Sequence, residues 1–270
     1  MNAQSEATVS ITFSYEELAL LLGLLKLPPL PGFPVDFLNE FRTETGRSRL
    51  DVAEHGLQAR QFIQVTPDRT ITVDPLVVSL LANFRASETL ITVLNINNGV
   101  TTQSLFGLSQ YMISEYTIAE PGMHRLTWFP DLKTLNGVLL VQNDLSTLDT
   151  PKQAIYIAVP PEWAQAYQAA LRQSTQGLAE YLTTHTGADP NAEALNAVFS
   201  SLREVYAVIG LRRDAETLKT LQNFAILRTA TDNWLLISDP QGTPDNLWLV
   251  QAGSVQIAEA LVTLEQALGL

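Results

Sequence analysis

The chain has 270 residues, of which 46% are hydrophobic, and 16 basic and 28 acidic side chains give it a formal net charge of −12. This negative charge repels phosphate backbones and anionic lipid, so we expect neither nucleic acid nor a membrane surface as a partner. Because cysteine is absent, disulfides, thiolate nucleophiles and cysteine-ligated metal sites are excluded. The N-terminus lacks a basic start, and the apolar run at residues 18–25 is too short to cross a bilayer, so we expect a cytoplasmic location.

The N-terminal part of the chain predicts a strand, several helices and a hairpin. Residues 8–13 alternate polar and apolar side chains, as a half-buried strand does. Ser14 and Glu17 have the spacing of a capping box, which predicts a helix that ends before the prolines at 28, 29 and 31. Asp74 followed by Pro75 predicts another helix, to about residue 85. Between these features we expect helices and a hairpin over residues 34–42, 49–60 and 62–73.

A succession of strands and turns then occurs twice. The first copy predicts three strands and a helix that Asp131 caps, with the strands at residues 89–96, 109–118 and 125–129. The second copy predicts three strands and a helix from Ser254, with the strands at residues 224–229, 234–238 and 247–251. The third strand of each copy carries a tryptophan, Trp128 or Trp248. An internal repeat of this kind predicts a duplicated architecture.

The residues between the two copies predict a short strand at 154–159 and a long αα-hairpin within residues 161–213. The second helix of this hairpin would carry the apolar residues Leu195, Val198, Phe199, Leu202, Val205, Tyr206 and Ile209. The whole pattern predicts an α+β protein that forms a single domain over residues 1–270. Its two quasi-symmetric halves, about 1–150 and 151–270, would each have an antiparallel sheet with packed helices.

No motif for catalysis, cofactor binding or metal binding stands out. The chain has neither a glycine-rich phosphate loop nor a nucleophile elbow. His55, His124 and His185 are far apart, and Asp51 and His55, which can share a helix face, have no third ligand in view. We therefore predict a non-enzymatic protein without catalytic residues, metal ion or cofactor. The alternative is a ligand-binding domain or an enzyme whose site is assembled from scattered residues.

An arginine-rich segment at residues 36–69 raises a DNA-binding alternative. It combines helices with a hairpin, as winged-helix domains do, and contains Arg42, Arg47, Arg49, Arg60 and Arg69. The same segment holds one more acidic residue than it holds arginines, namely Asp36, Glu40, Glu44, Asp51, Glu54 and Asp68. A DNA-binding face should be clearly basic, so we favour a surface of mixed ion pairs.

The chain resembles the EspG family, cytosolic chaperone-like proteins of type VII (ESX) secretion. One segment that carries the resemblance is the opening strand and leucine helix with the proline loop after it, residues 11–30. Another is the succession from His55-Gly56-Leu57 to Val73-Asp74-Pro75 and the helix that follows. The last is the C-terminal strand at Trp234 with the helix over residues 257–268.

The resemblance implies a mixed α/β fold of two quasi-symmetric halves that binds secreted helical proteins of the PE/PPE type and keeps them soluble. In that family a loop between central strands helps to hold the partner. The corresponding stretch here is residues 95–108, whose turn at 97–99 is short and polar. The residues expected to contact a partner are Asn97, Asn98, Thr101, Leu105 and Phe106.

The function expected from the sequence is therefore a non-catalytic, cytosolic adaptor or chaperone-like protein that binds another protein. We expect its contact patch to be bordered by residues 95–108 and by the helical hairpin at 161–213, because both flank the repeated strands. Such a patch should be broad, apolar and weakly charged, whereas an enzyme should show a deep pocket with convergent titratable groups.

Overall fold

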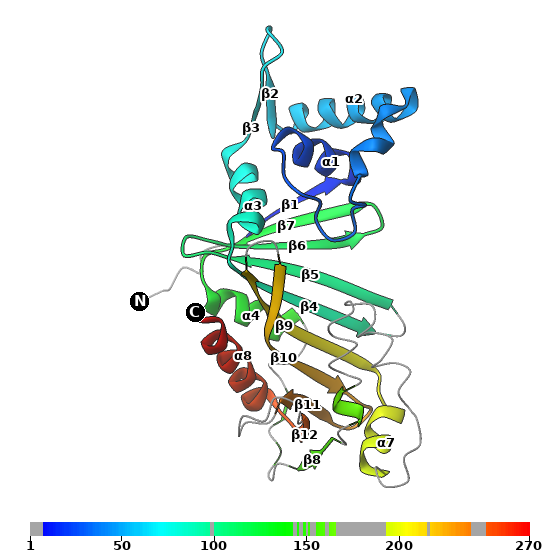
Figure 1. Cartoon of the computed structure of the whole chain (residues 1–270), viewed down its shortest axis with the longest axis vertical. Coiled ribbons are helices and arrows are strands. Elements are labelled where there is room, and N and C mark those ends of the chain that lie inside the picture. Colours follow the sequence, from blue (N-terminus) through cyan, green and yellow to red (C-terminus); the bar gives the residue numbers. More distant parts are fainter. Residues whose placement is uncertain are drawn as a thin grey trace. The chain divides into compact units, whose positions relative to one another are not determined.

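A computed structural model describes residues 8–97, 100–142, 145, 148–149, 151, 155–159, 162–165, 193–214, 217–238 and 247–270. It contains both helices and antiparallel strands, so the prediction of an α+β fold is confirmed (Figure 1). The chain divides into two compact units, each described by itself below. Unit 1 comprises Met1–Leu90 and Ser104–Thr134, and unit 2 comprises Ile91–Gln103 and Leu135–Leu270.

Unit 1 contains a four-stranded antiparallel sheet in the order β1-β7-β6-β5. The strands are β1 (Val9–Ser14), β7 (Met123–Phe129), β6 (Ile113–Glu120) and the second part of β5 (Val100–Leu108). The helices are α1 (Tyr15–Leu24), a 3-10 helix η1 (Phe37–Arg42), α2 (Glu44–Ala59) and α3 (Pro75–Ala86). Strands β2 (Ile63–Val65) and β3 (Ile71–Val73) form a separate hairpin, which agrees with the predicted one.

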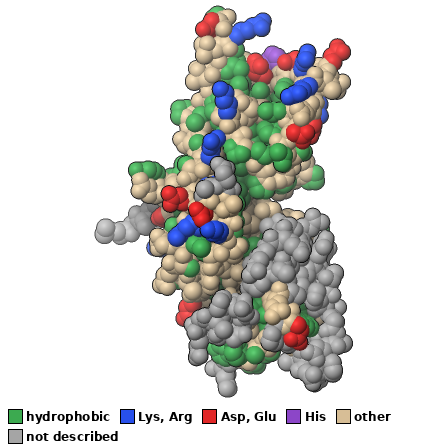
Figure 2. All heavy atoms as spheres, in the orientation of Figure 1, with side chains coloured by type: hydrophobic (Ala, Val, Ile, Leu, Met, Phe, Trp, Pro, Cys, Tyr) green, Lys and Arg blue, Asp and Glu red, His purple; other side chains and the backbone are tan. Residues whose placement is uncertain are grey.

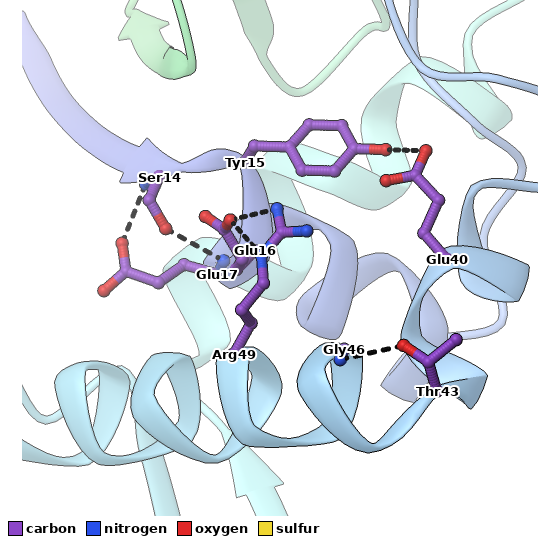
Figure 3. Close-up of polar contacts among 8 residues, drawn as sticks. All are labelled: Ser14, Tyr15, Glu16, Glu17, Glu40, Thr43, Gly46 and Arg49. Atoms are coloured by element: carbon purple, nitrogen blue, oxygen red, sulfur yellow. Dashed lines mark hydrogen bonds and ion pairs between the residues drawn. The ribbon is translucent and has the colours of Figure 1, made fainter.

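The helix starts in unit 1 follow from their capping side chains. Ser14 accepts a hydrogen bond from the Glu17 amide at 3.2 Å and Glu17 accepts one from the Ser14 amide at 2.9 Å, so the predicted capping box is confirmed (Figure 3). Asp74 caps α3 by accepting from the Leu76 amide at 2.9 Å. Helix α2 begins at Glu44, five residues before the predicted start, because Thr43 accepts from the Gly46 amide at 3.0 Å.

The core of unit 1 lies between one face of its sheet and the helices. Ile11 and Phe13 of β1, Tyr116 of β6 and Leu126 of β7 belong to the same buried cluster as apolar side chains of the helices, including Leu18, Leu21, Leu22, Leu57, Leu80 and Phe84. A buried amide also ties α3 to the sheet. The Asn83 side chain donates to the Gly107 carbonyl at 2.7 Å and to the Ser114 hydroxyl at 3.1 Å, so its polar group is satisfied in the interior.

Unit 2 contains strands in the order β4-β9-β10-β11-β12-β8. They are β4 (Thr89–Asn97), β9 (Glu204–Asp214), β10 (Thr217–Arg228), β11 (Asn233–Ser238), β12 (Leu247–Gln251) and β8 (Tyr156–Ala158). The first part of β5 and most of α4 (Leu132–Gln142) also belong to it, together with α7 (Glu193–Ser200) and α8 (Ser254–Leu268). As predicted, Asp131 caps α4, accepting from the Thr134 amide at 2.7 Å.

Both faces of the sheet in unit 2 are apolar. One face packs Leu94, Val205 and Ala207 against Val198 and Phe199 of α7. Side chains of the opposite face surround a small cavity together with α4 and α8: Val93, Tyr206, Val208, Phe224 and Ile226 from the strands, and Leu139, Leu140, Ile257 and Leu261 from the helices. A strand in a sheet covered on both faces is continuously apolar where it is covered, which is the pattern of residues 205–211 of β9.

The prediction that the second arm of the αα-hairpin is helical is wrong from residue 201 onward. Helix α7 ends at Ser200, and Val205, Tyr206 and Ile209 lie on β9. The first arm lies mainly outside the described residues. Its described part, residues 162–165, is helical. A fully buried strand and a buried helix give similar apolar runs, and here the strand follows a helix after three residues, so the two resemble one helix.

The repeated succession has four strands in each copy rather than three. Strands β4, β5, β6 and β7 follow one another, α4 comes next, and β7 also pairs with β1. Strands β9, β10, β11 and β12 likewise follow one another, α8 comes next, and β12 also pairs with β8. The sequence interpretation omits β5 from the first copy and assigns β9 to a helix in the second, so it loses one strand from each.

The two tryptophans do not occupy equivalent positions in this succession. The first residue of β7 that pairs with β6 is Met123. Trp128 lies five residues after it. Trp248 directly follows Leu247, the first paired residue of β12. The spacing between Trp128 and Trp248 therefore does not measure the repeat.

Gly46 and Gly137 offer a test of the packing between η1 and α2. A Cβ on Gly46 would lie 2.7 Å from the Phe41 Cα and overlap the Glu40 carbonyl oxygen, whereas a Cβ on Gly137 of α4 meets nothing within 4 Å. We expect Gly46→Ala to lower the free energy of unfolding by about 2 kcal/mol, because the backbone of η1 must move. Gly137→Ala should raise it by about 0.5–1 kcal/mol, the usual gain in a helix. Denaturant unfolding of both variants checks this, and equal effects in the two would contradict the packing described.

Candidate protein-binding site

The hairpin of β4 and β5 ends in an exposed, uncharged tip. We define the β4–β5 tip as Asn97, Val100, Thr101 and Thr102, all of which are exposed; Val100 keeps 65% of its surface accessible. Successive residues of a strand point to opposite faces, so three exposed residues in a row mean that both faces of β5 are open at this end. Residues 89–114 contain no Asp, Glu, Lys, Arg or His, in a chain with a net charge of −12. Charge-poor surface of this kind is typical of the centre of a protein interface.

Asn97 anchors the β4–β5 tip within unit 2. Its side-chain amide donates to Glu204 Oε1 at 3.0 Å, and Arg228 Nη1 donates to Glu204 Oε2 at 3.1 Å. These contacts join the end of β4 to the start of β9 and the end of β10. Asn97 therefore positions the hairpin as well as lying on its surface.

A second exposed hairpin end belongs to β9 and β10. Residues 217–221 of β10 are all exposed, including Leu218 at 49% and Leu221 at 39%. Unlike the β4–β5 tip, this end is charged, because Lys219 forms an ion pair with Asp214 and Arg213 lies opposite Leu218. The two hairpin ends are thus similar in exposure and different in charge.

The structure separates the residues predicted to contact a partner. Asn97 and Thr101 lie on the exposed tip, and Asn98 lies outside the described residues. Leu105 is half-buried and packs against the core of unit 1. Phe106 is only 1% exposed and its ring centroid lies 6.2 Å from that of Phe129, so the expectation that Phe106 contacts a partner is corrected by its burial.

The stretch at residues 95–108, which corresponds to a loop in the family that the sequence resembles, is mostly strand. Residue 97 ends β4 and residue 100 begins β5, so these two neighbouring strands are only two residues apart in the chain. Val100 and Thr102, which the sequence interpretation does not select, join Asn97 and Thr101 on the tip. The uninterrupted lack of charge from residue 89 to 114 is the sequence signal that could have identified them.

Unit 1 contains a cleft with titratable side chains, which bears on the enzyme alternative. The cleft has a volume of about 570 Å³ and lies between α1 and α2, where its lining includes Glu16, Glu17, Arg49, Val52, Gly56 and Arg60. Arg49 pairs with Glu16, and Arg60 pairs with Glu17 at 2.7 Å (Figure 3 shows the first pair). Burial alone would raise the pKa of Glu16, but the hydrogen bond and charge of Arg49 outweigh it and lower that pKa. A general acid or base at neutral pH needs the opposite shift, so this arrangement suits structural ion pairs.

A cavity of about 400 Å³ in unit 2 bears on the ligand-binding alternative. It lies between α8 and strands β10 to β12, and its apolar lining includes Phe224, Leu235, Ile237 and Val250. Glu259 contributes a carboxylate to the same lining. Nowhere in the described part of the chain do three or more His, Asp or Glu side chains form a group that could hold a metal ion.

The arginine-rich segment presents both signs of charge. Arg49 and Arg60 are neutralised by Glu16 and Glu17. Over α2 and the β2–β3 hairpin, basic and acidic side chains are interspersed on the face drawn in Figure 2. This mixture agrees with the predicted surface of mixed ion pairs. Within the described ranges, no helix is both long enough and apolar enough to span a bilayer.

The fold is an α+β architecture in which antiparallel strands carry packed helices and end in exposed hairpins. No family model and no curated protein matches the sequence. Among solved structures, the chain is similar to the Mycobacterium tuberculosis type VII secretion system chaperone EspG5, in its complex with the PE25–PPE41 dimer. The similarity has a TM-score of 0.62 and covers 96% of each chain at 11% sequence identity. The resemblance to the EspG family is thus confirmed at the level of the fold.

The anchor at Asn97 can be tested with two substitutions that add the same charge. Asn97→Asp would place a second carboxylate beside Glu204, so we expect it to lower the free energy of unfolding by about 1 kcal/mol. It should also increase protease cleavage in the hairpin. Thr101→Asp adds a carboxylate to an exposed position of the same tip and should change stability by less than about 0.5 kcal/mol. Urea unfolding and limited proteolysis measure both effects, and equal behaviour of the two variants would contradict the anchoring role.

Proposed function

We propose that this protein is a non-catalytic, chaperone-like protein that binds another protein through the β4–β5 tip. The similarity of its fold to EspG5, which was solved as a complex with the PE25–PPE41 dimer, supports a protein partner. The observation that carries the proposal is the exposed, charge-free tip. A surface without charge can be buried without the cost of removing ions from water.

The partner that we propose is a helical, secreted protein, as the family resemblance implies. Val100 offers an apolar contact, and the Asn97, Thr101 and Thr102 side chains offer short hydrogen-bonding groups. Such a tip suits an uncharged surface of the partner. A stable protein complex buries roughly 1,200–2,000 Å², more than four small side chains can supply. The contact must therefore extend beyond the tip.

Charge insertion at the tip tests this function. In cells of the organism that encodes the protein, the affinity-tagged chain should co-purify with a stoichiometric protein partner, identified by mass spectrometry. Val100→Glu should reduce the recovered partner at least tenfold, because a carboxylate buried in the interface without a counter-ion costs well over the roughly 1.4 kcal/mol that tenfold requires.

Val52→Glu provides the matched control. Val52 is 72% exposed on α2, so the same charge is added to a different surface. Recovery of the partner should be unchanged in this variant. If no stoichiometric protein is recovered with the unaltered chain, or if both variants reduce recovery equally, the proposed function is wrong.

A further inference from the structure

A single histidine is enclosed by aromatic rings in unit 1. His124 of β7 is 3% exposed. Its ring centroid lies 4.9 Å from that of Phe33, 5.8 Å from that of Tyr116 and 6.0 Å from that of Tyr15. We call these three rings the aromatic box. The box excludes water from the imidazole, and Phe33 belongs to the loop that follows α1.

A hydrogen-bond relay connects His124 to that loop. The Tyr116 hydroxyl lies 2.8 Å from His124 Nδ1 and 2.8 Å from the Pro31 carbonyl oxygen. A carbonyl can only accept, so Tyr116 donates its proton to Pro31. The hydroxyl oxygen is then the acceptor for a proton on Nδ1, so the neutral form of His124 is the tautomer with its hydrogen on Nδ1.

The loop covers His124 and packs on the core of unit 1 through its apolar side chains. It spans residues 27–34, which we call the proline loop. It is closed by a turn in which the Phe33 amide donates to the Leu30 carbonyl at 3.0 Å. Leu30 and Phe33 are 7% and 8% exposed, whereas Gly32 adopts a φ of +88° against Ile118. Lifting the loop would expose both apolar side chains and open the aromatic box to water.

We propose that His124 is a proton-sensitive latch, which holds the proline loop closed while neutral and favours its opening once protonated. The imidazolium needs water or a counter-ion, and the closed aromatic box supplies neither at close range. Opening the loop hydrates the ring. Protonation of His124 therefore favours the open loop, and closure of the loop disfavours protonation. This property does not depend on the proposed partner.

The groups that face His124 agree with this direction. The proline loop itself carries no ionisable side chain, and Phe13 of β1 lies opposite His124 in the sheet. Burial and Glu40 raise the pKa of Tyr15 to about 12, and burial raises the pKa of Tyr116, so both phenols are neutral. From α1, Glu16 favours the imidazolium, but it is already paired with Arg49. Burial outweighs Glu16 and lowers the pKa of His124.

The sign of the pH dependence follows from this shift. In the open loop His124 should titrate near the ordinary value of about 6.5, and in the closed loop it titrates lower. As the pH falls below about 6.5, the open state takes up the proton before the closed state does. The closed state therefore loses stability relative to the open state until the pH reaches the lower pKa that His124 has in the closed loop. One unit of pKa difference corresponds to a tenfold change in the opening equilibrium.

Hydrogen exchange on the full chain tests the latch. Exchange of peptides that cover residues 27–39 should be measured at pH 7.5 and pH 5.5 and divided by the intrinsic amide rates at each pH. In the unaltered protein we expect protection of these peptides to fall about five- to tenfold at pH 5.5, while peptides from β9 and β10 change much less. His124→Asn keeps a side-chain donor but cannot titrate, so its protection should not depend on pH.

Two further measurements keep the proposal testable if His124→Asn fails to fold. Tyr116→Phe removes the bond to Pro31 and should loosen the loop at both pH values. Imidazole resonances of the unaltered protein should show His124 titrating below pH 6.5. The proposal is overturned if His124 titrates at or above 6.5. It is also overturned if protection of the proline loop is independent of pH, or if His124→Asn shows the same pH dependence.

Discussion

The length of the strands relative to the helices that cover them is the constraint on which the candidate site depends. Strands β9 and β10 have 11 and 12 residues, and β4 and β5 have nine each. At about 3.3 Å per residue these strands run for roughly 30–40 Å. Helix α7, with eight residues, is about 12 Å long, and α8, with 15, about 22 Å. Each of these two described helices is therefore shorter than the strands, and the hairpin ends at residues 97–102 and 217–221 carry exposed side chains.

The two halves have the same succession of elements, so each half contains a hairpin of long strands with an exposed end. Each half has four consecutive strands and a following helix, and its last strand also pairs with a strand from earlier in that half. We propose that the halves arose by duplication and then diverged at the hairpin ends. The β9–β10 end carries charged residues such as Lys219 and Asp214, whereas the β4–β5 tip has none. Of these two hairpin ends, only the β4–β5 tip can enter an interface without removing its own ions from water. We therefore place the partner at the β4–β5 tip.

Capping residues in the sequence predict the helix starts that depend only on neighbouring residues. The capping box of Ser14 and Glu17 and the start of α3 at Asp74-Pro75 depend on neighbouring residues, and both predictions are confirmed. Strand β9 cannot be recognised in this way, because its two buried faces remove the alternation that identifies a strand. Strand β5 escapes prediction for the opposite reason, since its exposed threonines show no apolar face. Phe106 shows the same limit within the site, because only the fold determines that its side chain points into the core.

The most direct test of the account is whether the β4–β5 tip touches another protein in the cell. A photoreactive benzoylphenylalanine should be placed at Val100, and in a matched variant at Val255, which is 50% exposed on α8. Irradiation should join position 100 to one defined protein and leave position 255 without that product. Crosslinks at position 100 that stay within the chain, or the same product from both positions, would contradict the account.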